Sequence, residues 1–191
     1  PDNTGDGLVM AMGVGARLGN MRNAWWVPVT RAEGAQKWGA DRPHLVLLER
    51  TRPGSIMVNR TARRFCNEAG NYNALGGVFH QFDPSTFDYS NLPAWLIFDH
   101  RHKSAYDVAS CRAVDPAADW MVQAPTIEEL ASRLDLDPDT LRQTVDRFND
   151  HAVHGVDPDF GRGESAYDTF NGDQSLGGVA APLGPLDEGP F

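Results

Sequence analysis

The chain has 191 residues, of which 41% are hydrophobic and 23% charged, and a formal net charge of −9 at pH 7. These values are typical of a globular protein with one sizeable core. The acidic balance argues against a nucleic-acid or anionic-membrane partner, and no apolar run reaches the roughly 20 residues of a membrane span. Cys66 and Cys111 lack metal-ligand spacing, which predicts a reducing, cytoplasmic location and no structural zinc.

The first motif is a glycine-rich turn that leads into a helix. Thr4-Gly5-Asp6-Gly7 precedes small and apolar residues whose pattern predicts a helix ending near Gly19-Asn20. We expect Thr4 or Asp6 to cap the first turn, and the glycines to let the backbone lie close to a group bound at the helix N-terminus. A capped helix without any ligand explains the same pattern.

The most unusual stretch follows a predicted turn at Arg52-Pro53-Gly54. Ser55 to Asn59 has the pattern of a strand, which we expect to pair in a hairpin with the apolar run 45–48. Charged and polar residues then stand close to apolar ones, the main candidates being Arg64, Asn67, Glu68 and Tyr72. This mixture predicts a partly buried polar site. The alternative is a structural turn in which arginine and glutamate neutralise one another.

The second half of the chain supplies a strand and two helices. Residues Pro93 to Asp99 are apolar on both faces, which favours a position at the centre of a sheet. Helices are predicted after Thr126, which begins a capping-box pattern, and at Asp137-Pro138. The Gly/Pro-rich segment 172–191 has little periodicity and needs a partner surface to be ordered.

Two histidines beside Asp99 invite comparison with a metal site. His100 and His102 have an H-x-H spacing, which two metal ligands can adopt. No third ligand stands nearby at a convincing spacing. We therefore expect no metal.

Taken in order, these phrases resemble one family. The sequence is similar to the middle of flavin-dependent 3-ketosteroid Δ1-dehydrogenases, which belong to the fumarate reductase/succinate dehydrogenase flavoprotein superfamily. The resemblance covers nearly the whole chain. It rests on Thr4-Gly-Asp-Gly7, Ala24-Trp-Trp26, Pro53-Gly-Ser-Ile-Met-Val-Asn59, Arg64-Phe-Cys-Asn-Glu68, Pro93-Ala-Trp-Leu-Ile-Phe-Asp99 and Asp159-Phe-Gly-Arg-Gly-Glu-Ser-Ala-Tyr-Asp168.

The resemblance implies an α+β fold, with a small mixed sheet flanked by helices, and FAD as the cofactor. Residues 1–50 would be a remnant of the FAD-binding domain and its connection. Residues 51–191 would form the substrate-binding, or capping, domain with a Gly/Pro-rich return segment. The GxGxxG dinucleotide motif is absent, as is the family's C-terminal segment that clamps the 3-keto oxygen. We therefore expect a piece of a longer protein, inactive alone and unable to retain FAD tightly, whose partners are the remaining FAD-binding domain and a small-molecule substrate.

The resemblance also assigns roles to residues. Tyr72 would take a proton from C2 of the steroid while C1 gives a hydride to the flavin. A phenol is a weak base at neutral pH, so Tyr72 needs help, which in the family comes from a tyrosine upstream of Pro1. The other matched residues are expected to contact the cofactor (Thr4 and Asp6) or to brace the site (Arg64, Asn67 and Glu68).

Two other functions remain open. In soluble fumarate reductases an arginine that donates a proton takes the place of Tyr72, because a guanidinium suits a dicarboxylate and a phenol suits a ketone. A fumarate-reductase-like protein acting on a small unsaturated acid would need Arg60 or Arg63 as the donor. Ala69-Gly70-Asn71 departs from the Ser-x-Pro or Ala-Pro common in the dehydrogenases, which leaves the exact ketone or enone open. The third possibility is a free-standing, non-enzymatic α+β binding module.

Overall fold

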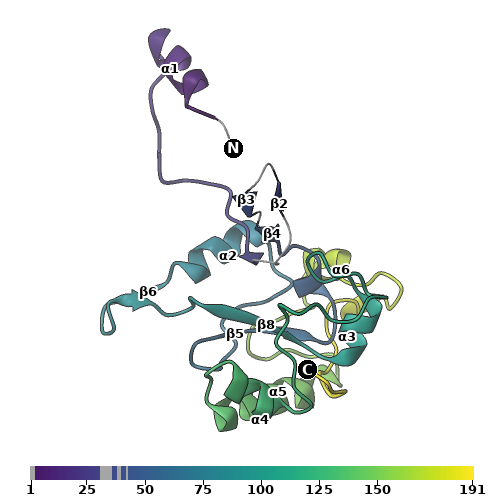
Figure 1. Cartoon of the computed structure of the whole chain (residues 1–191). Helices are drawn as coiled ribbons and strands as arrows, with labels where there is room; N and C mark the ends of the chain where they lie inside the picture. The colour runs from purple at the N-terminus through teal and green to yellow at the C-terminus, as the bar shows by residue number, and fades with distance from the viewer. Residues whose placement is uncertain (1–2, 31–35, 38–39, 42) are drawn as a thin grey trace.

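The computed structural model describes residues 3–30, 36–37, 40–41 and 43–191, in which helices are combined with short strand pairs (Figure 1). The helices are α1 (Asp6–Gly13), α2 (Tyr72–Phe79), α3 (His100–Ala105), α4 (Ile127–Arg133), α5 (Pro138–Ala152) and α6 (Ala166–Asn171). The strands are β1 (Val29–Thr30), β2 (Gln36–Lys37), β3 (Ala40–Asp41), β4 (His44–Leu45), β5 (Ser55–Asn59), β6 (Phe82–Asp83), β7 (Asp88–Tyr89) and β8 (Ala94–Phe98). Two 3-10 turns are η1 (Glu49–Thr51) and η2 (Gly178–Ala180). No helix of the described part is long and apolar enough to cross a membrane.

The antiparallel pair β5–β8 lies at the centre of the fold, with Met57 opposite Leu96. Alternate residues of a strand point to opposite faces, so each face of the pair contributes to a different cluster. Ile56, Val58 and Ile97 join the main core with α4 and α5. Met57 instead packs with Cys66 and Leu75 near α2. The pair therefore separates the main core from the region around α2 (Figure 1).

The two helices that the sequence predicts most clearly, α4 and α5, are confirmed. The Thr126 hydroxyl accepts a hydrogen bond from the Glu129 N–H at 3.2 Å at the start of α4. The Asp137 carboxylate accepts one from the Thr140 N–H at 2.8 Å, and Pro138 occupies the first turn of α5. The buried stripe of α5 is Leu141, Val145, Phe148 and Ala152.

The sheet is antiparallel, so the expected mixed sheet is wrong in this respect. The described strands form four two-stranded antiparallel pairs, which are β1–β4, β2–β3, β5–β8 and β6–β7. Residues 60–93 return the chain at the end where β5 finishes, so β8 runs back along it. Parallel strands would need a crossover to the opposite end. Among the described residues β8 has β5 as its only partner strand. The prediction that this strand has a neighbour on both sides of its sheet is therefore wrong.

The predicted hairpin between residues 45–48 and β5 is also wrong. Only Leu45 of this run lies in a strand, β4, and it pairs with Val29 of β1. The Glu49 carboxylate accepts a hydrogen bond from the Leu47 N–H at 3.0 Å, which favours a turn into η1. Leu45 and Leu48 are 45% and 52% exposed, so this run is not a buried strand.

α1 begins where the glycine-rich turn predicts but ends at Gly13, well before residue 19. Its N-cap is Gly5, at φ +87°, and no side chain caps the first turn. The Thr4 hydroxyl instead donates to the Asp6 carboxylate at 2.8 Å, so the predicted side-chain cap is wrong. No residue of α1 is buried, and Figure 1 shows the helix standing away from the other elements at the end of an extended segment.

The Gly/Pro-rich segment 172–191 finds the partner surface that its composition requires. Leu183 and Leu186 are buried in the main core. The Asn149 carboxamide of α5 accepts from the Leu186 N–H at 2.8 Å and donates to the Leu186 carbonyl at 2.7 Å. The segment is therefore ordered by α5 and the core rather than by its own regular structure.

Truncating the core should destabilise the chain strongly. Leu141 is fully buried in α5, so Leu141→Ala should lower the free energy of unfolding by about 2–5 kcal/mol. Urea unfolding followed by circular dichroism measures this change. Val153→Ala is the control, because Val153 is 59% exposed and its loss should change stability by less than about 0.5 kcal/mol. Equal effects would contradict the described core.

Candidate active site

Three of the residues that the sequence singles out belong to a buried polar cluster, namely Arg64, Asn67 and Glu68. Glu68 is fully buried and the Arg64 side chain is 4% exposed. Their partners come from a distant part of the chain, since Asp157 lies 93 residues beyond Arg64 in the sequence. Neither a surface loop nor a simple local turn describes this arrangement.

Glu68 lies at the centre of the cluster. One of its carboxylate oxygens accepts hydrogen bonds from the Met57 N–H at 3.0 Å and from Arg64 Nε at 2.9 Å. The other accepts from Arg64 Nη2 at 2.7 Å and from Arg162 Nη1 at 3.2 Å. Burial alone would raise the pKa of Glu68, but the two guanidinium groups hold it below its ordinary value. Glu68 is therefore ionised in the folded protein.

Arg64 bridges two carboxylates. Beside its bonds to Glu68, it donates to both oxygens of Asp157, at 2.7 and 2.8 Å. Its guanidinium lies 4.7 Å from the ring centroid of Phe148 and 5.1 Å from that of Phe160. Burial opposes its charge, but Glu68 and Asp157 together raise the pKa of Arg64. The arginine is thus committed to internal contacts in a fixed orientation.

Asn67 links the same loop to α6. Its Nδ2 donates to Asp168 at 2.9 Å, and its Oδ1 accepts from the Ala69 N–H at 2.9 Å. The same Asp168 oxygen also accepts from the Gly163 N–H at 3.0 Å. Because Asp168 is buried and lies 101 residues from Asn67, this contact ties two remote segments together.

Four charged residues complete the cluster and were missed by sequence reasoning, namely Arg50, Asp157, Arg162 and Asp168. Two of them lie in the phrase 159–168 that contributes to the family resemblance, so that phrase carried a signal. No spacing rule connects it to residues 64–68, because the contacts form only when the chain is folded. Arg50 had no such signal.

Tyr72 is the first residue of α2 and is half buried. The Asn71 side chain caps the helix by accepting from the Asn73 N–H at 2.9 Å. Within the part of the chain that the structure describes, the Tyr72 hydroxyl makes no hydrogen bond. Tyr72 therefore follows the buried residue Glu68 by four positions, at the start of α2.

The cofactor candidates Thr4 and Asp6 do not join this cluster. Both are exposed at the N-terminal end of α1, which Figure 1 shows apart from α2. A different residue of the N-terminal region, Trp26, does contact α2. The Trp26 N–H donates to Asn73 at 2.9 Å, and the Trp26 side chain packs so closely that a Cβ on Gly76 would lie 2.3 Å from it.

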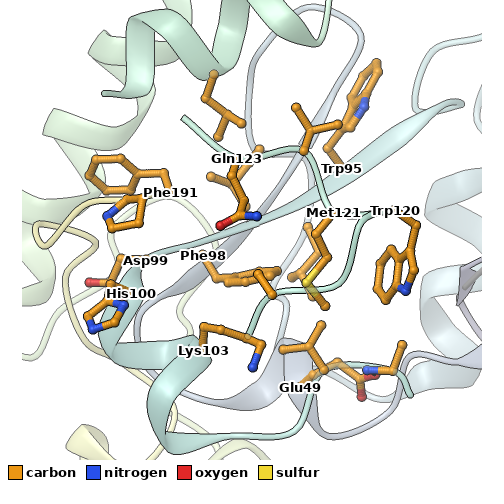
Figure 2. Close-up of a pocket in the computed structure, with 18 of the residues that line it drawn as sticks. Glu49, Trp95, Phe98, Asp99, His100, Lys103, Trp120, Met121, Gln123 and Phe191 are labelled. Atoms are coloured by element: carbon orange, nitrogen blue, oxygen red, sulfur yellow. The ribbon is translucent and has the colours of Figure 1, made fainter. Parts of the chain in front are cut away.

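A cavity of about 450 Å³ opens beside β8 (Figure 2). Its walls are largely aromatic and apolar, and include Trp95, Phe98, Trp120, Met121 and Phe191. The cation on its wall is already bonded, since Lys103 Nζ donates to the carbonyls of Arg112 at 2.8 Å and Asp115 at 3.0 Å. Tyr72 is not among the lining residues, so this cavity does not contain the predicted proton acceptor.

The described residues contain no group of three metal-binding side chains close enough to hold an ion. His102 is buried, and its Nδ1 donates to the Pro53 carbonyl at 2.9 Å. Burial lowers the pKa of His102 to about 4, so the ring is neutral at physiological pH. Its place is structural, between the rings of Phe98 and Tyr106.

The chain belongs to the FAD binding domain family, whose model matches residues 1–186. It is 42% identical over 191 residues to 4-oxocyclohexanecarboxylate 2-dehydrogenase of Sinomonas cyclohexanicum, covering 100% of this chain and 33% of that protein. It is 40% identical over 200 residues to 3-oxosteroid 1-dehydrogenase of Mycolicibacterium smegmatis, covering 99% of this chain and 33% of that protein. The chain thus spans about a third of the length of the curated relatives it matches.

A solved structure supports the same class. The fold is similar to that of 3-ketosteroid delta1-dehydrogenase from Sterolibacterium denitrificans in complex with 1,4-androstadiene-3,17-dione, with a TM-score of 0.83 and 31% sequence identity. The match covers 100% of this chain and 34% of that one. The family resemblance predicted from the sequence is therefore confirmed, and the family match implies FAD as the cofactor.

Neutralising Glu68 should destabilise the fold in a pH-dependent way. Glu68→Gln removes the anion that Arg64 and Arg162 share and should cost about 3–5 kcal/mol at pH 7. Because the pKa of Glu68 is lowered on folding, its contribution is present above the ordinary value of 4.5 and is lost as pH falls through the folded pKa. Denaturant unfolding between pH 7 and 3 measures the difference.

The matched control is Glu128→Gln on the surface of α4. Glu128 also pairs with an arginine, Arg142, at 2.6 Å, but both side chains are solvent-accessible. That substitution should change stability far less than Glu68→Gln at neutral pH. A cost for Glu68→Gln that stays constant down to pH 3 would contradict the stabilising role of its charge.

Proposed function

We propose that this chain is the substrate-binding, or capping, part of an FAD-dependent dehydrogenase that acts on a 3-ketosteroid or a similar cyclic ketone. The observation that carries the proposal is Tyr72, which begins α2 directly after a loop anchored by buried charges. The names of the relatives support the substrate class, since both a cyclic oxo acid and an oxosteroid are oxidised by proteins similar to this chain.

The reaction removes two hydrogens from adjacent carbons and leaves a double bond between them. Tyr72 takes the proton from C2, beside the carbonyl carbon, on its phenolic oxygen, while its own hydroxyl proton passes to the assisting group that the rest of the whole protein supplies. A bound FAD would supply the acceptor for the hydride that leaves C1. Arg64, Asn67 and Glu68 brace the loop before Tyr72 rather than react, because their polar atoms are engaged in internal contacts.

The residues at the start of the chain suit one edge of an FAD site. Gly5 has φ +87°, and a Cβ built on Gly5 or Gly7 meets no atom within 4 Å. The first-turn N–H groups of α1 have no acceptor within the helix, so they suit phosphate or hydroxyl oxygens. Thr4 and Asp6 would contact the cofactor beside this turn, and the rest of the FAD-binding domain would supply the other contacts.

We propose that the chain is divided between two domains. Residues 1–50 belong with the FAD-binding domain, and residues 51–191 form the capping domain. The exposed apolar side chains of α1, including Val9 and Met10 at 68%, suit a surface that the rest of the FAD-binding domain covers. We expect the isolated chain to be inactive and to bind FAD weakly, and the whole protein to be cytoplasmic.

A fumarate-reductase-like function is the second candidate. It requires Arg60 or Arg63 to donate the proton that Tyr72 would otherwise handle. Arg60 already donates to Asp88 at 2.8 Å and to the Tyr89 carbonyl at 2.7 Å, which favours a role in holding the β6–β7 hairpin. A free-standing binding module is less well supported, because the family match extends over residues 1–186.

The substrate class can be tested with the full-length flavoprotein that contains this chain. Under anaerobic conditions, its visible flavin absorbance should bleach with a 3-ketosteroid or with 4-oxocyclohexanecarboxylate, because either ketone can supply the hydride. Succinate is the control and should leave the flavin oxidised. Bleaching by succinate, with none of the ketones active, would instead support the fumarate-reductase-like alternative.

The role of Tyr72 can be tested separately in the same protein. Tyr72→Phe removes the proton acceptor and should slow flavin reduction by roughly 10²–10⁴-fold, with little change in ketone binding. Stopped-flow absorbance measures the rate. Tyr167→Phe, at a partly exposed tyrosine of α6, is the control and should react as the unmodified protein does. Normal rates in Tyr72→Phe would rule out Tyr72 as the proton acceptor.

A further inference from the structure

Arg50 is a buried cation without a carboxylate partner among the described residues. It is 1% exposed, and its guanidinium donates only to backbone carbonyls. Nε bonds to the Val46 carbonyl at 3.1 Å. Nη1 bonds to the carbonyls of Glu68 and Gly70, the latter at 2.8 Å. Burial lowers the pKa of Arg50, so the fold bears a cost to keep this charge where it is.

The two carbonyls that share Nη1 belong to the loop that enters α2. Both must point to Arg50, which sets the orientation of the peptide groups after Glu68 and Gly70. Asn67 holds the same loop independently, by accepting from the Ala69 N–H at 2.9 Å and from the Gly70 N–H, through its backbone carbonyl, at 3.0 Å. The loop is thus bound through its carbonyls by Arg50 and through its N–H groups by Asn67.

This loop is connected to Tyr72 by a single residue. Gly70 is followed by Asn71, the N-cap of α2, and then by Tyr72 as the first helical residue. A side chain in the first turn of a helix moves with the N-cap, so a shift of the Gly70 carbonyl moves the phenol. Trp26 contacts α2 at Asn73 and Gly76, whereas the loop is the part of the chain that leads directly into the N-cap and Tyr72.

We propose that Arg50 is a positioning residue for Tyr72, acting through the carbonyls of Glu68 and Gly70. The proposal rests on the proposed function of Tyr72 as the proton acceptor. Arg50 does not reach the substrate. It holds the loop so that the phenolic oxygen and the C2 proton meet in the orientation that proton transfer requires.

The guanidinium geometry explains why an arginine serves here. Its planar fork joins Val46, on one side of η1, to the loop at 68–70 with donors in fixed directions. A lysine at position 50 would keep the charge and reach a carbonyl with one compact ammonium group. It would not hold three carbonyls in a fixed plane. Arg50→Lys should therefore retain the fold and recover only part of the positioning.

The test uses the full-length flavoprotein with Arg50→Met, Arg50→Lys and the control Arg52→Met. Arg52 follows Arg50 by two residues and also donates to a backbone carbonyl, that of Gly172, away from the Tyr72 loop. Steady-state turnover of a reactive ketone with an added artificial electron acceptor gives kcat and KM, and thermal unfolding gives Tm. Deuterium at C2 of the ketone reports how far proton transfer limits the rate.

Arg50→Met should lower kcat by about 10²-fold with KM changed less than about threefold, because the reacting atoms are misplaced while binding remains. The isotope effect from C2 deuterium should rise above that of the unmodified protein. For Arg50→Lys, kcat and the isotope effect should lie between those of Arg50→Met and those of the unmodified protein. Arg52→Met should lower Tm without changing kcat or the isotope effect.

Three results overturn the proposal. An unchanged kcat in Arg50→Met does so directly, as does a loss of kcat in Arg52→Met equal to that in Arg50→Met at a similar Tm. If Arg50→Met does not fold, an Arg50→Lys protein with normal kcat and isotope effect is decisive against it. Failure of the unmodified protein to react with any ketone, or full activity in Tyr72→Phe, is a different outcome that overturns the proposed function and this inference with it.

Discussion

A buried carboxylate that must be paired governs the arrangement of this structure. Glu68 is fully enclosed and ionised, a state that is costly in a protein interior unless cations and N–H groups surround it. Arg64 and Arg162 supply the cations, and the Met57 N–H supplies a further hydrogen bond. Since these partners come from β5, the loop before α2 and the segment 157–168, correct placement of one carboxylate requires correct placement of all three.

The buried charges bind one another or the backbone, and this limits which ligands the nearby cations can bind. Arg64 is saturated by two carboxylates, and Lys103, beside the apolar cavity, is bonded to carbonyl oxygens. Neither cation is available to a charged ligand. The half-buried phenol of Tyr72 stands beyond the cluster, and a phenol suits a largely apolar ketone better than a dicarboxylate. The electrostatics therefore agree with the class of relatives to which the chain is similar.

Local signals in the sequence were sufficient for elements whose stability is local. The caps of α4 and α5 at Thr126 and Asp137 were predicted because an N-cap needs only its own helix. The sequence did not predict the partner strand of β5, because strand pairing depends on which distant strand packs against the same core. Arg64 and Glu68 were recognised through an ordered phrase, whereas Arg50 bonds to backbone carbonyls, which any sequence provides. Arg64 and Glu68 also have pairing partners more than 90 residues away, Asp157 and Arg162, and contacts at such distances leave no periodic pattern in the sequence.

The separation of the cluster's members along the chain has a consequence for the order of folding. The contact between Arg64 and Asp157 closes a loop of 93 residues, and that between Arg162 and the Arg50 carbonyl spans 112. Long loops are slow to close, so these two contacts form later than the local pair of Arg64 with Glu68. We therefore expect the loop before Tyr72 to gain its full set of contacts only after residues 157–168 have emerged from the ribosome. We expect the site to become ordered after the helices that are capped locally.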